Sequence, residues 1–497
     1  MTGKNLGLAA AAAMVLATAA RAAPPAERDW GAALARDAQA LHDDIAANHP
    51  GPVNPLDPGF AAINDRQLAI ALERAKAART YADYFFPLRI YVSAFNDGHL
   101  GFGANGDTPN DIRWPGFATR YDGRGRIVVA TSEPGQPVPQ GAELVGCDGM
   151  NAERYAEATL GTMWGRWQLE AQRRQWGRML FIDESSNLVP LARQCTFKVG
   201  AGTRKVVLAW RPLALTRVGN LFGMKTSSSR TTFGIRSAAG GLQWVTAPSF
   251  DGDPGSDAAK ALPPMIARLK AERQQFLAAP AIVFDLRGNG GGSSDWSRQM
   301  ADALWGSSAL AALSDEDVQV DWRASPANLV AVAQGYADRR DGPGFSPEAD
   351  NWFRSVIGGL GMAVARKQSL WRHVELDAPA ASPAATTPPA PTAPLANPVY
   401  VLTDSSCASA CLDAVDLWTA LGAIQIGRTT GADTLYMEVR QRTLPSGLTS
   451  ISVPMKVYRG RKRGSNQPAI PRFPFAGDID DTPALERWVA GLAAPRR

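Results

Sequence analysis

Two apolar runs, each followed by a turn and a helical pattern, constrain the fold of this chain most strongly. Residues 281–284 read Ala-Ile-Val-Phe and lead through a glycine-rich turn into a helical segment at residues 296–304. Residues 399–403 read Val-Tyr-Val-Leu-Thr and lead into a second helical segment at residues 410–421. Strands that alternate with helices in this way predict a largely parallel sheet with helices on its faces.

Further segments surround this core. Helical periodicity dominates the N-terminal part, and short β runs with one helical insertion near residues 152–176 follow between residues 114 and 212. The chain has 497 residues, of which 45% are apolar, so it is long enough for several domains. We therefore expect an α/β multidomain protein with these parts: residues 1–22 as a signal peptide, 26–105 as an N-terminal helical domain, 112–213 as a β-rich domain, 230–305 and 398–495 as the two parts of a split α/β core, and 306–397 as an insertion with a Pro/Ala-rich loop.

The N-terminus has the pattern of an export signal. Lys4 supplies a positive charge, residues 6–20 form an Ala-rich apolar run, and residues 20–22 read Ala-Arg-Ala, which suits cleavage before Ala23. The run is shorter than a membrane-spanning helix requires, and no later segment is long and apolar enough to form a stable membrane span. We expect a periplasmic or secreted protein.

Charge and cysteine content argue against a nucleic-acid-binding protein and against a zinc site. The net charge of +5 is spread over 52 basic and 47 acidic residues without a dense basic stripe, so nucleic acid is not an expected partner, and the basic stretch at residues 459–463 is interpreted as a solvated loop. Four cysteines fit an exported protein with one or two disulfides. Cys147 could pair with Cys195 across a sheet, but spacing does not fix connectivity. A zinc site at Cys407 and Cys411 is disfavoured because no second pair of ligands has metal-binding spacing.

The first segment with catalytic potential is the glycine-rich turn at residues 285–292, Asp-Leu-Arg-Gly-Asn-Gly-Gly-Gly. It follows a buried strand, at the sheet edge where α/β proteins place their sites, and the N–H groups of Gly290 and Gly291 are candidates for an oxyanion hole. A phosphate-binding loop is the alternative, but the Lys-Ser/Thr ending of that motif is absent. A tight turn without a catalytic task is also compatible with the pattern.

The second segment places Ser409 at the first turn of a helix. A serine there lies near the positive end of the helix dipole, which favours a nucleophile and its oxyanion. The structural alternative is an N-cap, for which Ser405 and Ser406 compete.

The third segment is the loop that carries His99, which reads Asn-Asp-Gly-His at residues 96–99 and could position a general base.

Together, the three segments resemble the C-terminal-processing (tail-specific) protease family of serine peptidases, in its tricorn-like branch. The family's Asp-Leu-Arg-x-Asn-x-Gly-Gly segment is matched at residues 285–292. Its Leu-Thr-Asp strand end and Ser-Ala step are matched at residues 402–404 and 409–410, and the branch's Asp-Gly-His loop at residues 97–99. The resemblance extends from about residue 49 to residue 489.

This resemblance implies amide hydrolysis through an acyl-enzyme, with peptides or proteins as substrates and without a metal or organic cofactor. Ser409 would attack, and His99 would take and return the proton. The oxyanion would be held by the N–H groups of Ala410 and of Gly290 or Gly291. The β-rich domain would correspond to the PDZ-like module that many such proteases carry.

The chain departs from the family pattern at two places. The lysine of members with a Ser-Lys dyad is absent from residues 429–434, which leaves His99 as the better base and Lys456 as a remote alternative. The glutamate that orients the histidine is also missing, and the third member of the catalytic set is either Asn466 or Glu438. These departures keep open a catalytically inactive peptide- or ligand-binding protein, and an esterase that uses the same serine.

Overall fold

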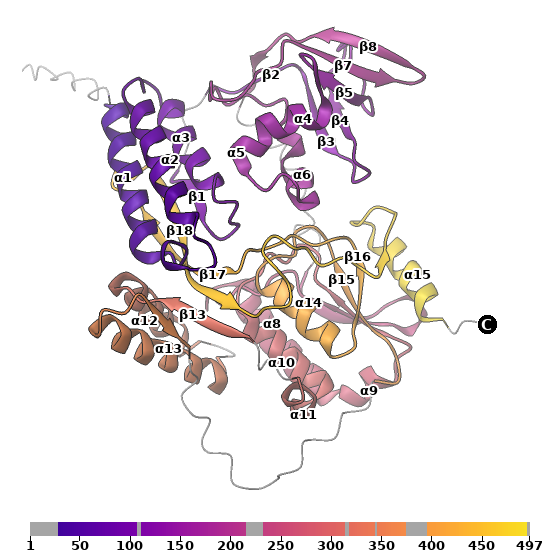
Figure 1. The fold of residues 1–497 in the computed structure, drawn as a ribbon. Helices are drawn as coiled ribbons and strands as arrows, with labels where there is room; N and C mark the ends of the chain where they lie inside the picture. The colour runs from indigo at the N-terminus through magenta and orange to yellow at the C-terminus, as the bar shows by residue number, and fades with distance from the viewer. Residues whose placement is uncertain are drawn as a thin grey trace, which may run out of the picture.

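The computed structural model in Figure 1 arranges the chain as a central sheet, a second sheet with packed helices, and a separate β-rich module. The expected signal peptide and most of the Pro/Ala-rich loop lie outside the described residues. The structure describes residues 28–106, 111–214, 232–313, 318–342, 345–373 and 395–494.

The central sheet has six strands in the order β10-β11-β12-β15-β16-β19. All neighbours run parallel except β10 and β11. The two apolar runs form β12 and β15, which pair directly, and all residues of both strands are buried. The strand bounds are β10 Gly234–Ser237, β11 Gln243–Thr246, β12 Ile282–Asp285, β15 Val399–Thr403, β16 Ile424–Gly427 and β19 Phe473–Pro474.

Helices cover both faces of this sheet, as the alternating pattern predicts. Phe284 and its same-face neighbours pack against α8, α10 and α14, whereas Val283 packs on the opposite face against α15. The α/β fold class and its largely parallel core are therefore confirmed. The helices of this part are α8 Asp257–Ala271, α9 Arg273–Ala278, α10 Ser294–Trp305, α11 Ser307–Ala311, α14 Ala410–Ala420 and α15 Thr482–Ala493, with a short 3-10 turn, η5, at Ala239–Gly241.

A second sheet joins distant parts of the chain. Its order is β1-β18-β13-β14, with β17 also paired to β18. The N-terminal helices share one hydrophobic core with Ile451 and Val453 of β18, and Figure 1 shows them beside that strand. The elements are α1 Trp30–Asn48, η1 Gly51–Val53, α2 Phe60–Ala75, α3 Tyr81–Ser93, β1 Gly101–Ala104, β13 Gln319–Arg323, β14 Leu370–Arg372, β17 Tyr436–Thr443 and β18 Thr449–Arg459. Two helices of the insertion, α12 Pro326–Arg339 and α13 Pro347–Ala365, pack against Trp322 of β13.

The β-rich module contains a sheet of order β3-β4-β5-β7-β8, with β6 paired to β5 and a separate β2-β9 pair. The expected helical insertion near residues 152–176 is present as α4, η2, α5 and α6, and it is interrupted at Gly165, which takes φ 65° and ψ 178° and ends α5. The elements are β2 Arg113–Trp114, β3 Phe117–Tyr121, β4 Ile127–Ser132, β5 Glu143–Cys147, β6 Met150–Asn151, α4 Ala152–Ala156, η2 Glu157–Gly161, α5 Thr162–Trp164, α6 Glu170–Trp176, η3 Gly177–Met179, β7 Gln194–Val199, β8 Gly202–Val207 and β9 Arg211–Pro212.

All four cysteines form disulfides. Cys147 bonds Cys195 between the paired strands β5 and β7, and Cys407 bonds Cys411 around the start of α14, so neither of the latter is available to zinc. Within the described ranges, no helix is both long enough and apolar enough to cross a bilayer.

The basic stretch at residues 459–463 is not a solvated loop. Arg459, Arg461 and Arg463 are largely buried and form ion pairs with acidic side chains. Their partners are Asp321 for Arg459 and both Asp413 and Asp416 for Arg461 and Arg463.

Candidate active site

Ser409 stands at the start of α14 in an unusual backbone conformation. It has φ 54° and ψ −126°, a region that non-glycine residues occupy at a cost of roughly 1–3 kcal/mol. Its hydroxyl makes no capping hydrogen bond within the described part of the chain, in contrast to the N-cap alternative. The side chain is instead directed to His99, whose Nε2 lies 3.3 Å from Oγ of Ser409.

His99 reaches this position because the strand that follows its loop joins the second sheet. Gly101 of β1 pairs with Ser452 of β18, which places the loop at residues 96–99 beside the C-terminal half. Asp97 holds the loop, since its Oδ1 accepts the N–H of His99 at 2.9 Å. Two residues that are 310 positions apart in the chain are thereby brought into contact.

The glycine-rich turn lies against the serine. A Cβ built on Gly291 would lie 2.6 Å from Cβ of Ser409, so only glycine permits this approach. The N–H of Gly291 donates to Oδ1 of Asn289 at 2.9 Å and is engaged within the turn. The N–H of Gly290 has no acceptor among the described residues. Of the two glycines, Gly290 therefore has the N–H that is free to meet an oxyanion, beside the N–H of Ala410 at the first position of α14.

The charged residues of the same turn stabilise the fold. Arg287 forms a bidentate, buried ion pair with Asp285, at 2.8 and 2.6 Å, and donates to the carbonyl of Ile479 at 2.7 Å. Asp285 also accepts the indole N–H of Trp244 at 3.0 Å. These contacts fix the end of β12 against the chain that precedes α15, and they hold the glycines in place.

The sequence interpretation did not identify Asp433 as part of this site. Its Oδ2 accepts the backbone N–H of Ser409 at 2.6 Å, and the side chain is buried. Asp433 lies in the stretch at residues 429–434, where members of the family with a Ser-Lys dyad carry their lysine. The signal in the sequence was a short acidic side chain two residues after Gly431.

Asn466 lies beside the loop that carries His99. Its Nδ2 donates to the carbonyl of Asn96 at 2.9 Å, and its own N–H donates to the carbonyl of Asp433 at 2.6 Å. Nδ1 of His99 and Oδ1 of Asn466 are both buried, and neither has a partner within the described ranges. One is a potential donor and the other an acceptor, so the two atoms are chemically complementary.

The carboxylate of Glu438 forms an ion pair with Lys456. The Lys456 ammonium lies 3.3 Å from Oε2 of Glu438 and 5.4 Å from the ring of Trp322. Burial by itself would lower the pKa of Lys456, but Tyr458, Glu438 and a more distant aspartate raise it above its ordinary value. The lysine therefore stays protonated, and it is unsuited to act as a base.

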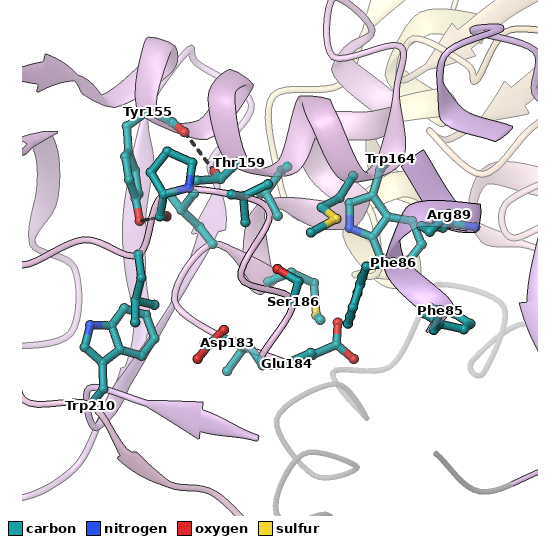
Figure 2. A pocket seen from close by; sticks show the side chains of 18 residues that line it. Phe85, Phe86, Arg89, Tyr155, Thr159, Trp164, Asp183, Glu184, Ser186 and Trp210 are labelled. Carbon is teal, nitrogen blue, oxygen red and sulfur yellow. Dashed lines mark hydrogen bonds between the residues drawn. The ribbon is translucent and has the colours of Figure 1, made fainter. Parts of the chain in front are cut away.

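A cavity of about 150 Å³ lies between α3 and the β-rich module and is lined by neither Ser409 nor His99. Figure 2 shows mostly aromatic and aliphatic side chains around it, together with Arg89 and Glu184. The Arg89 guanidinium lies 3.8 Å from the ring centre of Trp164. This cavity is separate from the serine and histidine.

Comparisons with known proteins found one family match and several similar structures. Residues 244–468 match peptidase family S41. The structure of mature CPAF is similar with a TM-score of 0.58 and 14% identity, over 93% of this chain and 97% of that one. CPAF complexed with lactacystin gives a TM-score of 0.57 at 15% identity, over 93% and 98% of the two chains. The photosystem II D1 C-terminal processing protease gives 0.34 at 14% identity, over 93% and 98%. No curated protein sequence gave a match.

The split α/β core and the family match define a serine-type peptidase, a hydrolase that acts on peptide or protein substrates. The match to peptidase family S41 covers residues 244–468, and it supports the resemblance to the C-terminal-processing proteases.

Proposed function

We propose that this peptidase cleaves peptide bonds through an acyl-enzyme formed on Ser409, with His99 as the general base. The observation that supports the proposal is the 3.3 Å contact between Nε2 of His99 and Oγ of Ser409, made by a hydroxyl that caps no helix. A histidine base in an Asp-Gly-His loop is the feature of the tricorn-like branch.

In the proposed first step, the Oγ proton passes to Nε2 of His99 while Oγ forms a bond to the scissile carbonyl carbon. The resulting oxyanion is held by the N–H groups of Gly290 and Ala410, aided by the positive end of α14. The imidazolium then returns the proton to the leaving amine as the C–N bond breaks. Water hydrolyses the remaining ester by the same sequence, which regenerates the hydroxyl of Ser409.

Asn466 is the proposed third member of the catalytic set. Its unpartnered Oδ1 would accept the N–H at Nδ1 of His99, which leaves Nε2 free to take the serine proton. A closing movement in the substrate complex would form this bond, since catalytic hydrogen bonds are often long before substrate binds. Glu438 is not proposed for this role, because its carboxylate faces Lys456.

A fluorophosphonate probe followed by peptide mapping tests the proposal. We expect rapid labelling at Ser409 in the intact chain, none in Ser409→Ala, and prevention of labelling by lactacystin, a ligand of the similar CPAF. Absence of labelling would favour a binding protein on this scaffold. Hydrolysis of nitrophenyl esters without hydrolysis of casein would favour an esterase.

We also propose that the protein is exported and that its mature form begins near Ala23. The signal pattern precedes the described residues, and the two disulfides suit an oxidising compartment. N-terminal sequencing of the protein from the periplasm or medium tests this proposal. Recovery of an intact Met1 terminus in the cytosol would contradict it.

A further inference from the structure

Asp97 is a buried carboxylate, two residues before His99, whose oxygens both accept hydrogen bonds. Besides the N–H of His99, its Oδ1 accepts the hydroxyl of Thr434 at 2.8 Å. Its Oδ2 accepts from Nε2 of His49 at 3.3 Å. Asp97 therefore connects the backbone of the proposed base to two distant side chains, one from the end of α1 and one from the chain before β17.

His49 is fixed as a neutral donor. Its Nδ1 accepts the N–H of Gly51 at 2.8 Å, which leaves the ring proton on Nε2, facing Asp97. Its ring stacks on Phe60 with centroids 4.4 Å apart. Burial lowers the pKa of His49. Burial alone would raise the pKa of Asp97, but the hydrogen bonds from the His49 ring and from the N–H of His99 lower it below its ordinary value. An ionised carboxylate thus faces a neutral imidazole.

Thr434 is the residue directly after Asp433. Asp433 holds the backbone N–H of Ser409 at 2.6 Å, and Thr434 holds Asp97 at 2.8 Å. Both side chains are buried. Because successive Cα atoms are about 3.8 Å apart across a planar peptide, a shift of the backbone at one contact is passed to the other. One dipeptide therefore links the nucleophile to the loop of the base.

We infer that Thr434 and His49 are positioning residues, which fix His99 relative to Ser409 through Asp97. This inference rests on the proposed function, in which His99 serves Ser409. Thr434 and His49 do not touch the reacting atoms, so their loss is expected to slow acylation while substrate binding is kept. A displacement on the order of 1 Å at a reacting centre lowers rates by about 100-fold.

The test compares Thr434→Val, which keeps the shape but removes the hydroxyl, with Thr434→Ser, which keeps the hydroxyl. In the full chain, we expect Thr434→Val to lower both fluorophosphonate labelling of Ser409 and kcat by about 10- to 100-fold. We expect KM to stay within about twofold, because the contacts that bind the substrate before the reaction are unchanged. Thr434→Ser is expected to retain most of the wild-type rate.

Thr119→Val is the matched control. Thr119 is also buried, and its hydroxyl donates to the carbonyl of Gly177 at 2.8 Å within the β-rich module. We expect it to lower the thermal unfolding temperature somewhat less than Thr434→Val, because the hydroxyl of Thr434 also accepts the N–H of Tyr436 at 3.1 Å. Its labelling rate is expected to remain that of the wild type. Equal slowing in Thr119→Val and Thr434→Val would assign the effect to general stability and overturn the inference.

A second pair of variants covers the case in which Thr434→Val does not fold. His49→Gln keeps a donor toward Asp97, whereas His49→Phe keeps an aromatic ring on Phe60 without the donor. We expect slow labelling in His49→Phe and recovery in His49→Gln. Wild-type labelling rates in Thr434→Val or His49→Phe would overturn the inference and leave the proposed function intact. A wild-type chain that is not labelled at Ser409 would overturn both.

Discussion

Nε2 of His99 lies 3.3 Å from Oγ of Ser409, although the two residues belong to opposite ends of the chain. The contact depends on the pairing of β1 with β18, which carries the N-terminal loop to the C-terminal half. The proposed catalytic pair is thus brought together only when the N-terminal helices and the second sheet have folded together. Damage to that shared core is expected to affect activity as well as stability.

The first prediction concerns the identity of the base. His99→Ala is expected to reduce acylation by about 10²- to 10⁴-fold, the usual contribution of general acid–base catalysis, with much less effect on peptide binding. Lys456→Met serves as the comparison, because the raised pKa of that lysine keeps it protonated. Single-turnover labelling of both variants measures the difference. A normal rate in His99→Ala with loss in Lys456→Met would establish a relocated Ser-Lys dyad instead.

The second prediction concerns the close approach of Gly291 to the nucleophile. In Gly291→Ala, the new methyl group would lie 2.6 Å from Cβ of Ser409 and 2.7 Å from the carbonyl oxygen of Ala408, at a φ of +105°. We expect loss of labelling by more than about 100-fold, because the serine must move by a large fraction of an ångström.

Gly447→Ala separates backbone strain from this steric effect. Gly447 has a φ of +77°, and nothing lies within 4 Å of an added Cβ. The substitution is expected to lower the free energy of unfolding by about 1 kcal/mol without slowing the labelling of Ser409. Comparable loss of labelling in both variants would show that the contact with Ser409 is not the cause.

The sequence predicts local features of this protein better than distant contacts. The apolar runs that form β12 and β15 are readable because a strand buried on both faces needs consecutive apolar residues. The pairing of β1 with β18 is not readable, because no local pattern encodes a partner more than 300 residues away. The interruption of the helical insertion at Gly165 is also not readable, because glycine is tolerated inside helices as well.

The same division applies to the candidate site. Sequence motifs select Ser409, His99 and the glycine turn, because each motif is continuous in the chain. The supporting contacts are discontinuous: Asp433 on the N–H of Ser409, and Thr434 on Asp97. Such contacts depend on tertiary packing, which no spacing rule gives.

The third prediction separates the two disulfides by function. In the loop-entropy account, Cys147–Cys195, which closes 48 positions, contributes about 4 kcal/mol, whereas Cys407–Cys411, which closes four, contributes about 2 kcal/mol. The short one brackets the strained backbone of Ser409, so its removal is expected to have the larger effect on activity.

Two double alanine variants, one for each disulfide, test whether one bridge affects mainly stability and the other mainly activity. Denaturant unfolding is expected to show the larger loss for Cys147→Ala with Cys195→Ala, and labelling of Ser409 the larger loss for Cys407→Ala with Cys411→Ala. Activity that simply follows stability in the two variants would rule out a special role for the bridge around the serine.

The fourth prediction concerns acid stability of the insertion. Burial and the nearby Lys456 lower the pKa of His373 from 6.5 to about 4. Between these values an unfolded chain binds a proton that the folded chain does not, so the free energy of unfolding falls as pH drops from about 6.5 to about 4. His373→Gln removes this titration, and its melting temperature is expected to depend less on pH in that window. An unchanged slope would contradict the burial of a neutral imidazole there.

The last prediction concerns His42, for which the free energy of unfolding is expected to change with pH in the opposite direction. Burial opposes its protonation, but the hydrogen bonds to Asp65 and Asp43, at 2.9 and 3.0 Å, and the charges of these carboxylates together raise its pKa above 6.5. Its stabilising contribution is therefore fully present below about pH 6.5 and is lost as pH rises through the raised value. His42→Gln is expected to destabilise the protein more at pH 5.5 than at pH 8.5, as thermal unfolding at about these values would measure. A larger loss at the alkaline value would show that the imidazole is neutral between the two carboxylates.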